Sequence, residues 1–163
     1  MNPREIPNYW EGHCFACSKT NMKGLQLRFW RTQQGCFTHC SIPDHLCGFD
    51  GIVHGGILAT LLDEVGAWAI ITHLTRFGVT QEITVRYYKP VPTNREIVVE
   101  GQIISNDERK GILHSTVHDV HRTLLAESES KWLFPSLSHI AKISGIDISI
   151  LQEFLDQYSQ ADI

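Results

Sequence analysis

The segment from Gly48 to Ile70, GFDGIVHGGILATLLDEVGAWAI, constrains the fold more than any other part of the sequence. Its large apolar residues recur every three or four positions, which predicts one long helix from about Gly56 to Thr75. Two polar groups interrupt the apolar character: His54-Gly55-Gly56 at the start and Asp63-Glu64 in the middle. Because an unpaired carboxylate is costly to bury, these residues either face water or are retained for chemistry.

The rest of the chain is dominated by alternating apolar and polar residues, which predict strands. In the stretch after the helix, Ile83, Val85 and Tyr87 alternate with Glu82, Thr84 and Arg86. The predicted strands cover residues 24–31, 36–42, 80–91, 95–105, 112–120 and 124–134. Residues 1–22 are predicted to be irregular, residues 43–51 to be a loop, and the tail to form two short amphipathic helices divided at Gly145. One helix against a run of strands is an α+β arrangement. We expect one domain over residues 1–135, with residues 136–163 as a helical extension packed on it.

Composition and charge exclude several classes of protein. A length of 163 residues with 42% hydrophobic and 20% charged residues is typical of one globular domain. A net charge of −4 argues against a nucleic-acid binder, which has a basic face. No apolar run approaches the roughly 20 residues of a membrane span, and the start lacks a signal-peptide core. Five cysteines without a secretory signal favour a reduced setting. We therefore expect a cytoplasmic protein with no nucleic-acid or membrane partner.

Four motifs occur in a characteristic order: HCFACSKTNMKGLQLRFW, IVHGGILATLLDE, VTQEITVRYYKPV and LLAESESKWLF. In this order they resemble the hotdog-fold acyl-CoA thioesterases, and most closely the PaaI-like subgroup of phenylacetyl-CoA and 4-hydroxybenzoyl-CoA thioesterases. The resemblance extends from about Cys14 to Leu133. It implies a hotdog fold, in which a curved antiparallel β-sheet wraps a long central helix, with the C-terminal helices as an addition. It also implies dimers that join two sheets, and often tetramers.

Within this resemblance, His54-Gly55-Gly56 is a candidate oxyanion site. The first turn of a helix has N–H groups without internal partners, and the helix dipole favours negative charge there. The carbonyl oxygen of a thioester becomes negative during attack, so the Gly55 N–H is a natural donor. His54 either holds the same oxygen or orients the loop, and Gly56 lets the substrate approach the backbone. The alternative is a glycine-rich helix start that His54 caps.

Asp63 is the candidate catalytic carboxylate, as general base or as nucleophile. It follows His54 by nine residues, which corresponds to about 13 Å along a helix and to roughly the opposite face. The two therefore cannot serve one site within one chain. They meet if two such helices pack antiparallel across a two-fold axis, as the resemblance implies. Glu64 is the rival, because related enzymes use a glutamate on this helix, but Asp63 matches the position better. The pair could instead cap or bridge a neighbouring segment.

Further substrate-binding candidates are Thr80, Arg86 and Lys89. Thr80 matches a position where a hydroxyl helps to orient the attacking water, although a β-branched residue there also suits a strand. Arg86 and Lys89, like the Arg109-Lys110 pair in a turn, are cations available for coenzyme A phosphates, or simply solvated charges. One family feature is missing: no Asn or Gln occupies residues 48–50 before His54.

A zinc site is the competing interpretation of the cysteines. Cys14-x2-Cys17 is a ligand-like pair, with Cys36, His39, Cys40 and Cys47 as further candidates. In a strand, however, Cys36 and Cys40 face one way and His39 the other. Buried thiols therefore explain the pattern better, and we expect no metal.

These observations predict an acyl-CoA thioesterase that needs no cofactor, since coenzyme A is part of its substrate. The alternative is a hotdog module that binds acyl-CoA without cleaving it, because the superfamily also includes sensors and dehydratases. A dehydratase usually needs a histidine and an acid close together in one chain. The retained Asp63 favours hydrolysis over binding alone.

Overall fold

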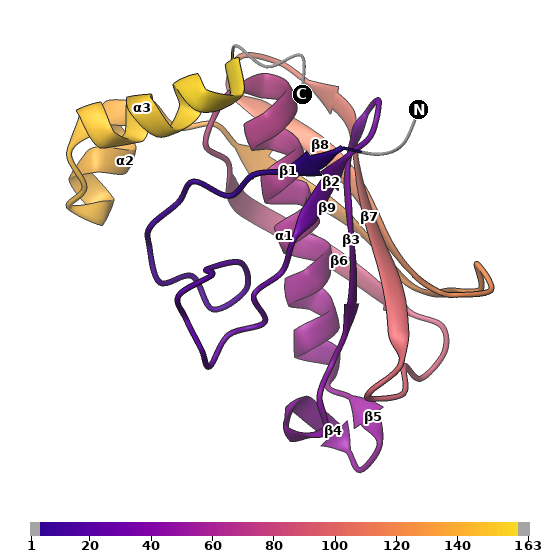
Figure 1. Cartoon of the computed structure of the whole chain (residues 1–163). Coiled ribbons are helices and arrows are strands. Elements are labelled where there is room, and N and C mark those ends of the chain that lie inside the picture. The colour runs from indigo at the N-terminus through magenta and orange to yellow at the C-terminus, as the bar shows by residue number, and fades with distance from the viewer. Residues whose placement is uncertain (1–3, 160–163) are drawn as a thin grey trace.

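The computed structural model describes residues 4–159. One long helix lies across a curved antiparallel sheet, and two short helices follow at the C-terminal end (Figure 1). The helices are α1 (Gly55–Leu74), α2 (Leu137–Ser144) and α3 (Ile148–Ser159), with a 3-10 turn, η1 (Asp44–Leu46). The strands are β1 (Glu5–Ile6), β2 (Phe29–Arg31), β3 (Gly35–Ser41), β4 (Cys47–Phe49), β5 (Ile52–Val53), β6 (Val79–Tyr87), β7 (Glu96–Asn106), β8 (Lys110–Asp119) and β9 (Leu124–Leu133).

Seven of the strands form one sheet in the order β1-β2-β3-β7-β8-β9-β6, and every neighbouring pair is antiparallel. β4 and β5 form a separate two-stranded hairpin before α1. The strand that follows α1 in the chain, β6, therefore lies at one edge of the sheet. This arrangement confirms the predicted α+β class and the hotdog fold, in which the sheet wraps around one central helix.

α1 begins one residue earlier than its pattern predicts. His54 caps it: the ring Nδ1 accepts a hydrogen bond from the Gly56 N–H at 2.9 Å. The helix face against the sheet is buried through Leu58, Leu61, Leu62, Val65, Trp68, Ala69 and Ile70. Gly66 is required there, because a Cβ would lie 2.9 Å from the indole of Trp132 on β9. The glycine thus allows the helix and the sheet to approach closely.

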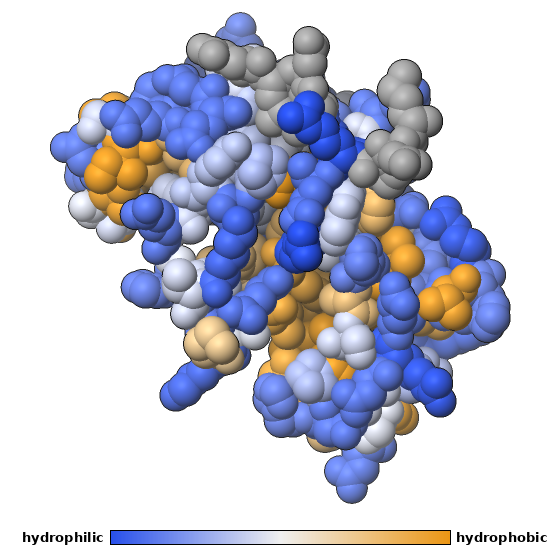
Figure 2. Space-filling view, in the orientation of Figure 1, coloured by the Kyte–Doolittle hydropathy of each residue, from blue (hydrophilic) through white to orange (hydrophobic). Residues whose placement is uncertain are grey.

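The sequence predicted no apolar run near the length of a membrane span, but α1 is such a run. By length and composition alone, its 20 residues are long and apolar enough to cross a membrane. Half of its apolar stretch is buried within the fold, as in the core helix of a globular domain. Figure 2 shows apolar side chains that remain at the surface along α1. A helix that is apolar on all sides is typically covered on all sides.

The predicted strand over residues 24–31 is mostly wrong. Only Phe29–Arg31 forms a strand, in which Trp30 and Arg31 pair with β3. Gln26 has a φ of 50°, which breaks the extended run. The Leu25 N–H donates to the Phe15 carbonyl at 2.7 Å, so this segment bonds to the N-terminal loop instead of the sheet. Two short pairings were also not predicted: β1 beside β2, and the β4–β5 hairpin, of which β4 lies within the expected loop and β5 directly follows it.

The C-terminal tail packs on the same core as the sheet, over the C-terminal half of α1 (Figure 1). The two predicted helices are present, and Gly145 ends α2 with a φ of 72°. From α3, Phe154 packs edge-on against Trp10 at 5.1 Å between ring centroids, and Tyr158 lies 6.0 Å from Trp68 of α1. The tail therefore ties the N-terminal segment to the central helix.

Candidate active site

Asp63 projects from the middle of α1 toward the start of β6. Its Oδ1 accepts a hydrogen bond of 2.6 Å from the Thr80 hydroxyl. Burial raises the pKa of the half-buried carboxyl, and the hydrogen bond from Thr80 partly opposes that rise. Within residues 4–159 no other hydrogen bond or ion pair reaches this carboxyl group. Its remaining lone pairs are free to accept a proton.

A β-bulge turns Thr80 toward α1. Simple alternation along β6 gives Thr80 the same face as Glu82, which points away from the helix. In the structure, however, Thr80 pairs with Trp132, whereas Glu82 pairs with the adjacent residue Lys131. Gln81 is thus the extra residue of a bulge, and one extra residue reverses the alternation. Directly paired residues share a face, so Thr80 points inward with Trp132, which is 2% exposed.

The helix start presents one free donor. The Gly56 N–H is already bonded to His54, and the Gly55 carbonyl accepts a 2.8 Å hydrogen bond from the Tyr87 hydroxyl. Within the described residues the Gly55 N–H has no acceptor. His54 itself is exposed, and its Nδ1 is used for capping. The capping role anticipated as the alternative is therefore present, and it leaves Gly55 as the available donor.

Tyr87 is a part of this region that sequence reasoning missed. Its inward direction was visible in the alternation of β6, but nothing in the sequence indicated that its hydroxyl would bond to Gly55. A cavity of about 310 Å³ lies beside this contact, lined among others by Gly55, Leu58, Tyr87 and Lys89. The cavity gives a ligand access to the helix start.

The two halves of the predicted site lie apart within one chain. Gly55 contacts Tyr87, at the end of β6, whereas Asp63 contacts Thr80, at its beginning. Within residues 4–159, no hydrogen bond or ion pair joins Asp63 to His54 or Gly55. This separation agrees with the helical geometry expected from the sequence.

The two predicted cations differ in their surroundings. Arg86 lies 3.9 Å from Glu127, which also bonds to His114 at 3.0 Å. Lys89 is exposed and takes part in none of the ion pairs formed by the described residues. It borders both the cavity at Gly55 and a second cavity of about 660 Å³, which Arg95 also lines. Lys89 is therefore better placed than Arg86 to meet an anionic ligand.

Glu64 points away from Asp63, toward the N-terminal loop. Its Oε1 accepts a hydrogen bond from the Trp68 indole at 3.3 Å and lies 3.9 Å from the Cys14 sulfur. Burial raises the pKa of Glu64 to about 7. The other cysteines considered as ligands do not join this group: the Cys36 thiol, for example, donates to the Val65 carbonyl.

Part of the chain resembles a known protein family. Residues 50–126 match the family model described as the thioesterase superfamily. The acyl-coenzyme A thioesterase THEM4 of Mus musculus is 29% identical over 90 residues, which is 55% of this chain and 38% of the mouse protein. The chain covers 60% or less of the length of the curated relatives that it matches first.

Solved structures share the fold. The PaaI protein of E. coli, from the phenylacetic acid degradation operon, has a TM-score of 0.64 at 15% identity, over 69% of this chain and 81% of PaaI. A thioesterase protein of Streptococcus pneumoniae TIGR4, solved with coenzyme A, has a TM-score of 0.63 at 15% identity, over 68% of this chain and 86% of that one. Residues 50–126 thus resemble the thioesterase superfamily, and the chain shares the hotdog fold of these solved structures.

Proposed function

We propose that this chain is an acyl-CoA thioesterase, which hydrolyses an acyl-CoA thioester to a free acid and coenzyme A. The observation that carries the proposal is Asp63: a half-buried carboxyl group in an apolar helix, held by one hydroxyl and otherwise free. The resemblance of residues 50–126 to the thioesterase superfamily supports hydrolysis of a thioester, and the coenzyme A in the S. pneumoniae structure supports the substrate class.

In the proposed reaction, water attacks the thioester carbonyl carbon and Asp63 takes the proton of that water. The carbonyl oxygen becomes negative and accepts a hydrogen bond from the Gly55 N–H, aided by the positive end of the helix dipole. Collapse of the intermediate breaks the carbon–sulfur bond, and the leaving thiolate of coenzyme A takes up a proton. In the second version of the mechanism, Asp63 attacks the carbonyl carbon itself and displaces the coenzyme A thiolate, which takes up a proton. Water then hydrolyses the resulting anhydride to the free acid and the Asp63 carboxylate.

The site requires a second copy of the chain. β6 ends the sheet, so its outer edge is unpaired within the described residues, and an exposed edge is a template for pairing. If two copies of β6 pair antiparallel about a two-fold axis, the start of one strand lies beside the end of the other. Thr80 marks the start and holds Asp63, while Tyr87 marks the end and holds Gly55. Such a dimer therefore brings Asp63 of one subunit to Gly55 of the other.

The apolar surface along α1 supports the same assembly, because a contact across the two-fold axis would cover it (Figure 2). We also assign Lys89 to binding the coenzyme A phosphates.

We place the protein in the cytoplasm. The five cysteines, all free thiols, support this proposal, because cysteines stay reduced in that compartment. The reaction needs no cofactor, since general base catalysis by a carboxylate supplies the proton transfer.

The test is thiol release from a panel of aliphatic and aromatic acyl-CoAs by the wild type and Asp63→Asn. The proposal predicts turnover by the wild type, and a loss of about 10²–10⁴-fold in kcat in the variant while acyl-CoA binding persists. Binding without thiol release across the whole panel would contradict it and establish the alternative, a non-catalytic acyl-CoA-binding module.

A further inference from the structure

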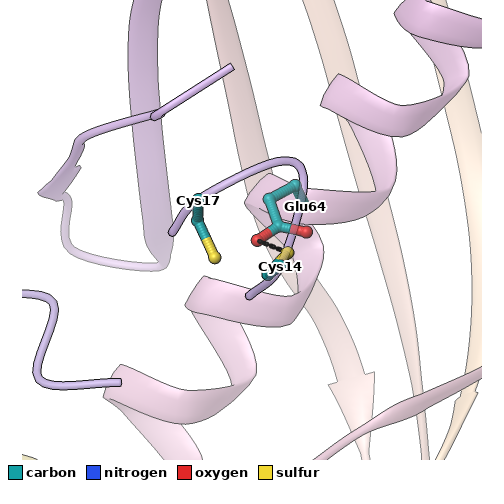
Figure 3. A group of neighbouring side chains, drawn as sticks. All are labelled: Cys14, Cys17 and Glu64. Carbon is teal, nitrogen blue, oxygen red and sulfur yellow. Dashed lines mark hydrogen bonds between the residues drawn. The ribbon is translucent and has the colours of Figure 1, made fainter. Parts of the chain in front are cut away.

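Three acidic side chains from two distant parts of the chain meet beside α1. Cys14 and Cys17 come from the N-terminal loop, and Glu64 comes from the helix (Figure 3). The two Sγ atoms and one carboxylate oxygen all lie within 4.8 Å of one another. Figure 3 shows the two sulfur atoms and the carboxyl group directed toward the same small space. The thioesterase mechanism uses none of these groups.

The cluster lacks a compensating cation. Cys17 is 6% exposed, and Cys14 and Glu64 are half-buried. None of the ion pairs formed by residues 4–159 includes Glu64. Trp68 is its donor within the helix. Burying several acidic groups together is unfavourable unless they stay protonated or share a positive partner. A divalent cation is a partner that all three groups can share.

The N-terminal loop directs several donors at the Cys14 sulfur. The Cys17 thiol and the backbone N–H groups of Cys17 and Ala16 direct hydrogen bonds at it. A bound metal would replace the thiol protons, because cysteine coordinates a metal as the thiolate. Backbone donors to a ligating atom are the supporting contacts typical of metal sites.

Hydrogen bonds within the protein hold the N-terminal loop in this geometry without an ion. The Ser18 N–H donates to the Cys14 carbonyl at 3.0 Å and closes the turn between the two cysteines. The Asn8 amide donates to the Cys17 carbonyl at 2.9 Å, and the Leu27 N–H to the Ala16 carbonyl at 2.9 Å. These bonds anchor the pair of cysteines opposite Glu64, so binding needs side-chain adjustment alone.

We propose that Cys14, Cys17 and Glu64 bind one zinc ion, with a water molecule as the fourth ligand. Two thiolates and a carboxylate form a ligand set suited to zinc, which prefers tetrahedral coordination by sulfur, nitrogen and carboxylate oxygen. Zinc–sulfur bonds of about 2.3 Å bring the two sulfur atoms to about 3.7 Å from each other. Binding releases the protons of the two thiols, and any proton on Glu64, to solvent.

A bound ion would connect the N-terminal loop to the central helix, one residue away from Asp63. The site stands independently of the proposed hydrolysis, because its ligands face away from Thr80 and Gly55. A disulfide between Cys14 and Cys17 is the competing fate of such a pair. It leaves the position of Glu64 unexplained, whereas a metal site uses all three side chains.

The test is titration of the reduced, metal-free full chain with Co²⁺ and then Zn²⁺, after free thiols have been counted. The proposal predicts one Co²⁺ per chain, with thiolate-to-cobalt charge-transfer absorption and the strong visible bands of tetrahedral cobalt, and displacement by Zn²⁺. The Cys17→Ser variant should bind Co²⁺ at least about 100-fold more weakly than the wild type does. That loss exceeds the 10–100-fold cost of losing a residue that only supports a ligand. Cys47→Ser, which alters a half-buried cysteine outside the cluster, is the matched control and should bind as the wild type does.

Glu64→Gln keeps the shape and the Trp68 contact, so it tests the third ligand without depending on the fold of a cysteine variant. It should weaken cobalt binding and change the visible bands. Far-UV circular dichroism checks that each variant is folded. Two results would overturn the proposal: a fully reduced wild type that binds no stoichiometric metal, or Cys17→Ser and Glu64→Gln variants that bind as tightly as the wild type.

Discussion

Asp63 and Glu64 are adjacent in the sequence, yet their carboxyl groups lie in two different regions of the molecule. Successive helical residues are about 100° apart around the axis, so Asp63 faces β6 and Glu64 faces the N-terminal loop. Asp63 meets a hydroxyl near the free edge of the sheet. Glu64 meets an indole and two thiols inside a loop that the chain itself closes. Burial raises the pKa of both groups.

The difference between the two regions lies in what would complete them. The region around Asp63 ends at β6, whose outer edge is unpaired within the described residues, so a second copy of the chain can complete it. The region around Glu64 is closed by the N-terminal loop of the same chain, and the proposed zinc ion would complete it. Asp63 and Glu64 both carry a carboxyl group on the same apolar helix. Because different elements pack against each, the two groups are suited to different chemistry.

After the loss of Asp63 itself, the largest effect should come from the loss of the Gly55 N–H at the start of α1. Gly55→Pro removes the one free N–H, and proline is well tolerated at the first position of a helix. We expect kcat to fall by about 10²–10³-fold, the cost of losing one oxyanion donor. Gly55→Ala keeps the N–H, and its Cβ would lie 3.5 Å from Tyr87, an ordinary contact. Equal activity of the two variants would contradict the oxyanion role.

The second prediction concerns stability in the Glu64 region. Burial raises the pKa of Glu64 from 4.5 to about 7, so the folded protein retains a proton that the unfolded chain releases. The free energy of unfolding therefore falls as pH rises from about 4.5 to 7. In metal-free, reduced protein we expect the wild type to lose about 1–3 kcal/mol relative to Glu64→Gln over this range. Urea unfolding between pH 5 and 8 measures the free energy of unfolding of both proteins. If the wild type and Glu64→Gln show the same pH dependence, the pKa of Glu64 is not raised in the folded protein.

The smallest effect should come from Thr80. Its hydrogen bond lowers the pKa of Asp63, so Thr80→Val raises that pKa further. Because the base must be deprotonated, the acidic limb of the kcat/KM profile should move to higher pH, with a loss of about tenfold or less below the limb. Thr80→Ser retains the hydroxyl and should keep the wild-type profile. If the limb of the valine variant does not move, Thr80 does not act on Asp63.

The parts of the fold that local patterns determine were predictable. α1 was predicted to within one residue, and β3, β6, β7, β8, β9 and the tail helices follow from their periodicities. Residues 24–28 were not, because their alternation resembles a strand while their hydrogen bonds go to Phe15 and Ala16. A local sequence pattern does not indicate which distant backbone groups a segment will bond to.

The same limit applies to the candidate site. Asp63, Gly55 and Thr80 were chosen from the sequence, and their catalytic roles stay predictions. The contact between Asp63 and Thr80 depends on a bulge at Gln81 that no alternation indicates. Likewise, Glu64 is 47 residues from Cys17, and no spacing motif joins them. Chemistry that depends on distant pairs appears only when the fold is known.

The most direct measurement of the central claim is activity of a mixed dimer. Asp63→Asn and Gly55→Pro chains with different affinity tags are co-expressed, and the heterodimer is purified through both tags. Each variant alone has two damaged sites. If Asp63 of one subunit acts with Gly55 of the other, the heterodimer has one intact site of two and recovers about half of the wild-type kcat per dimer. A heterodimer no more active than its parents would contradict a site shared between subunits.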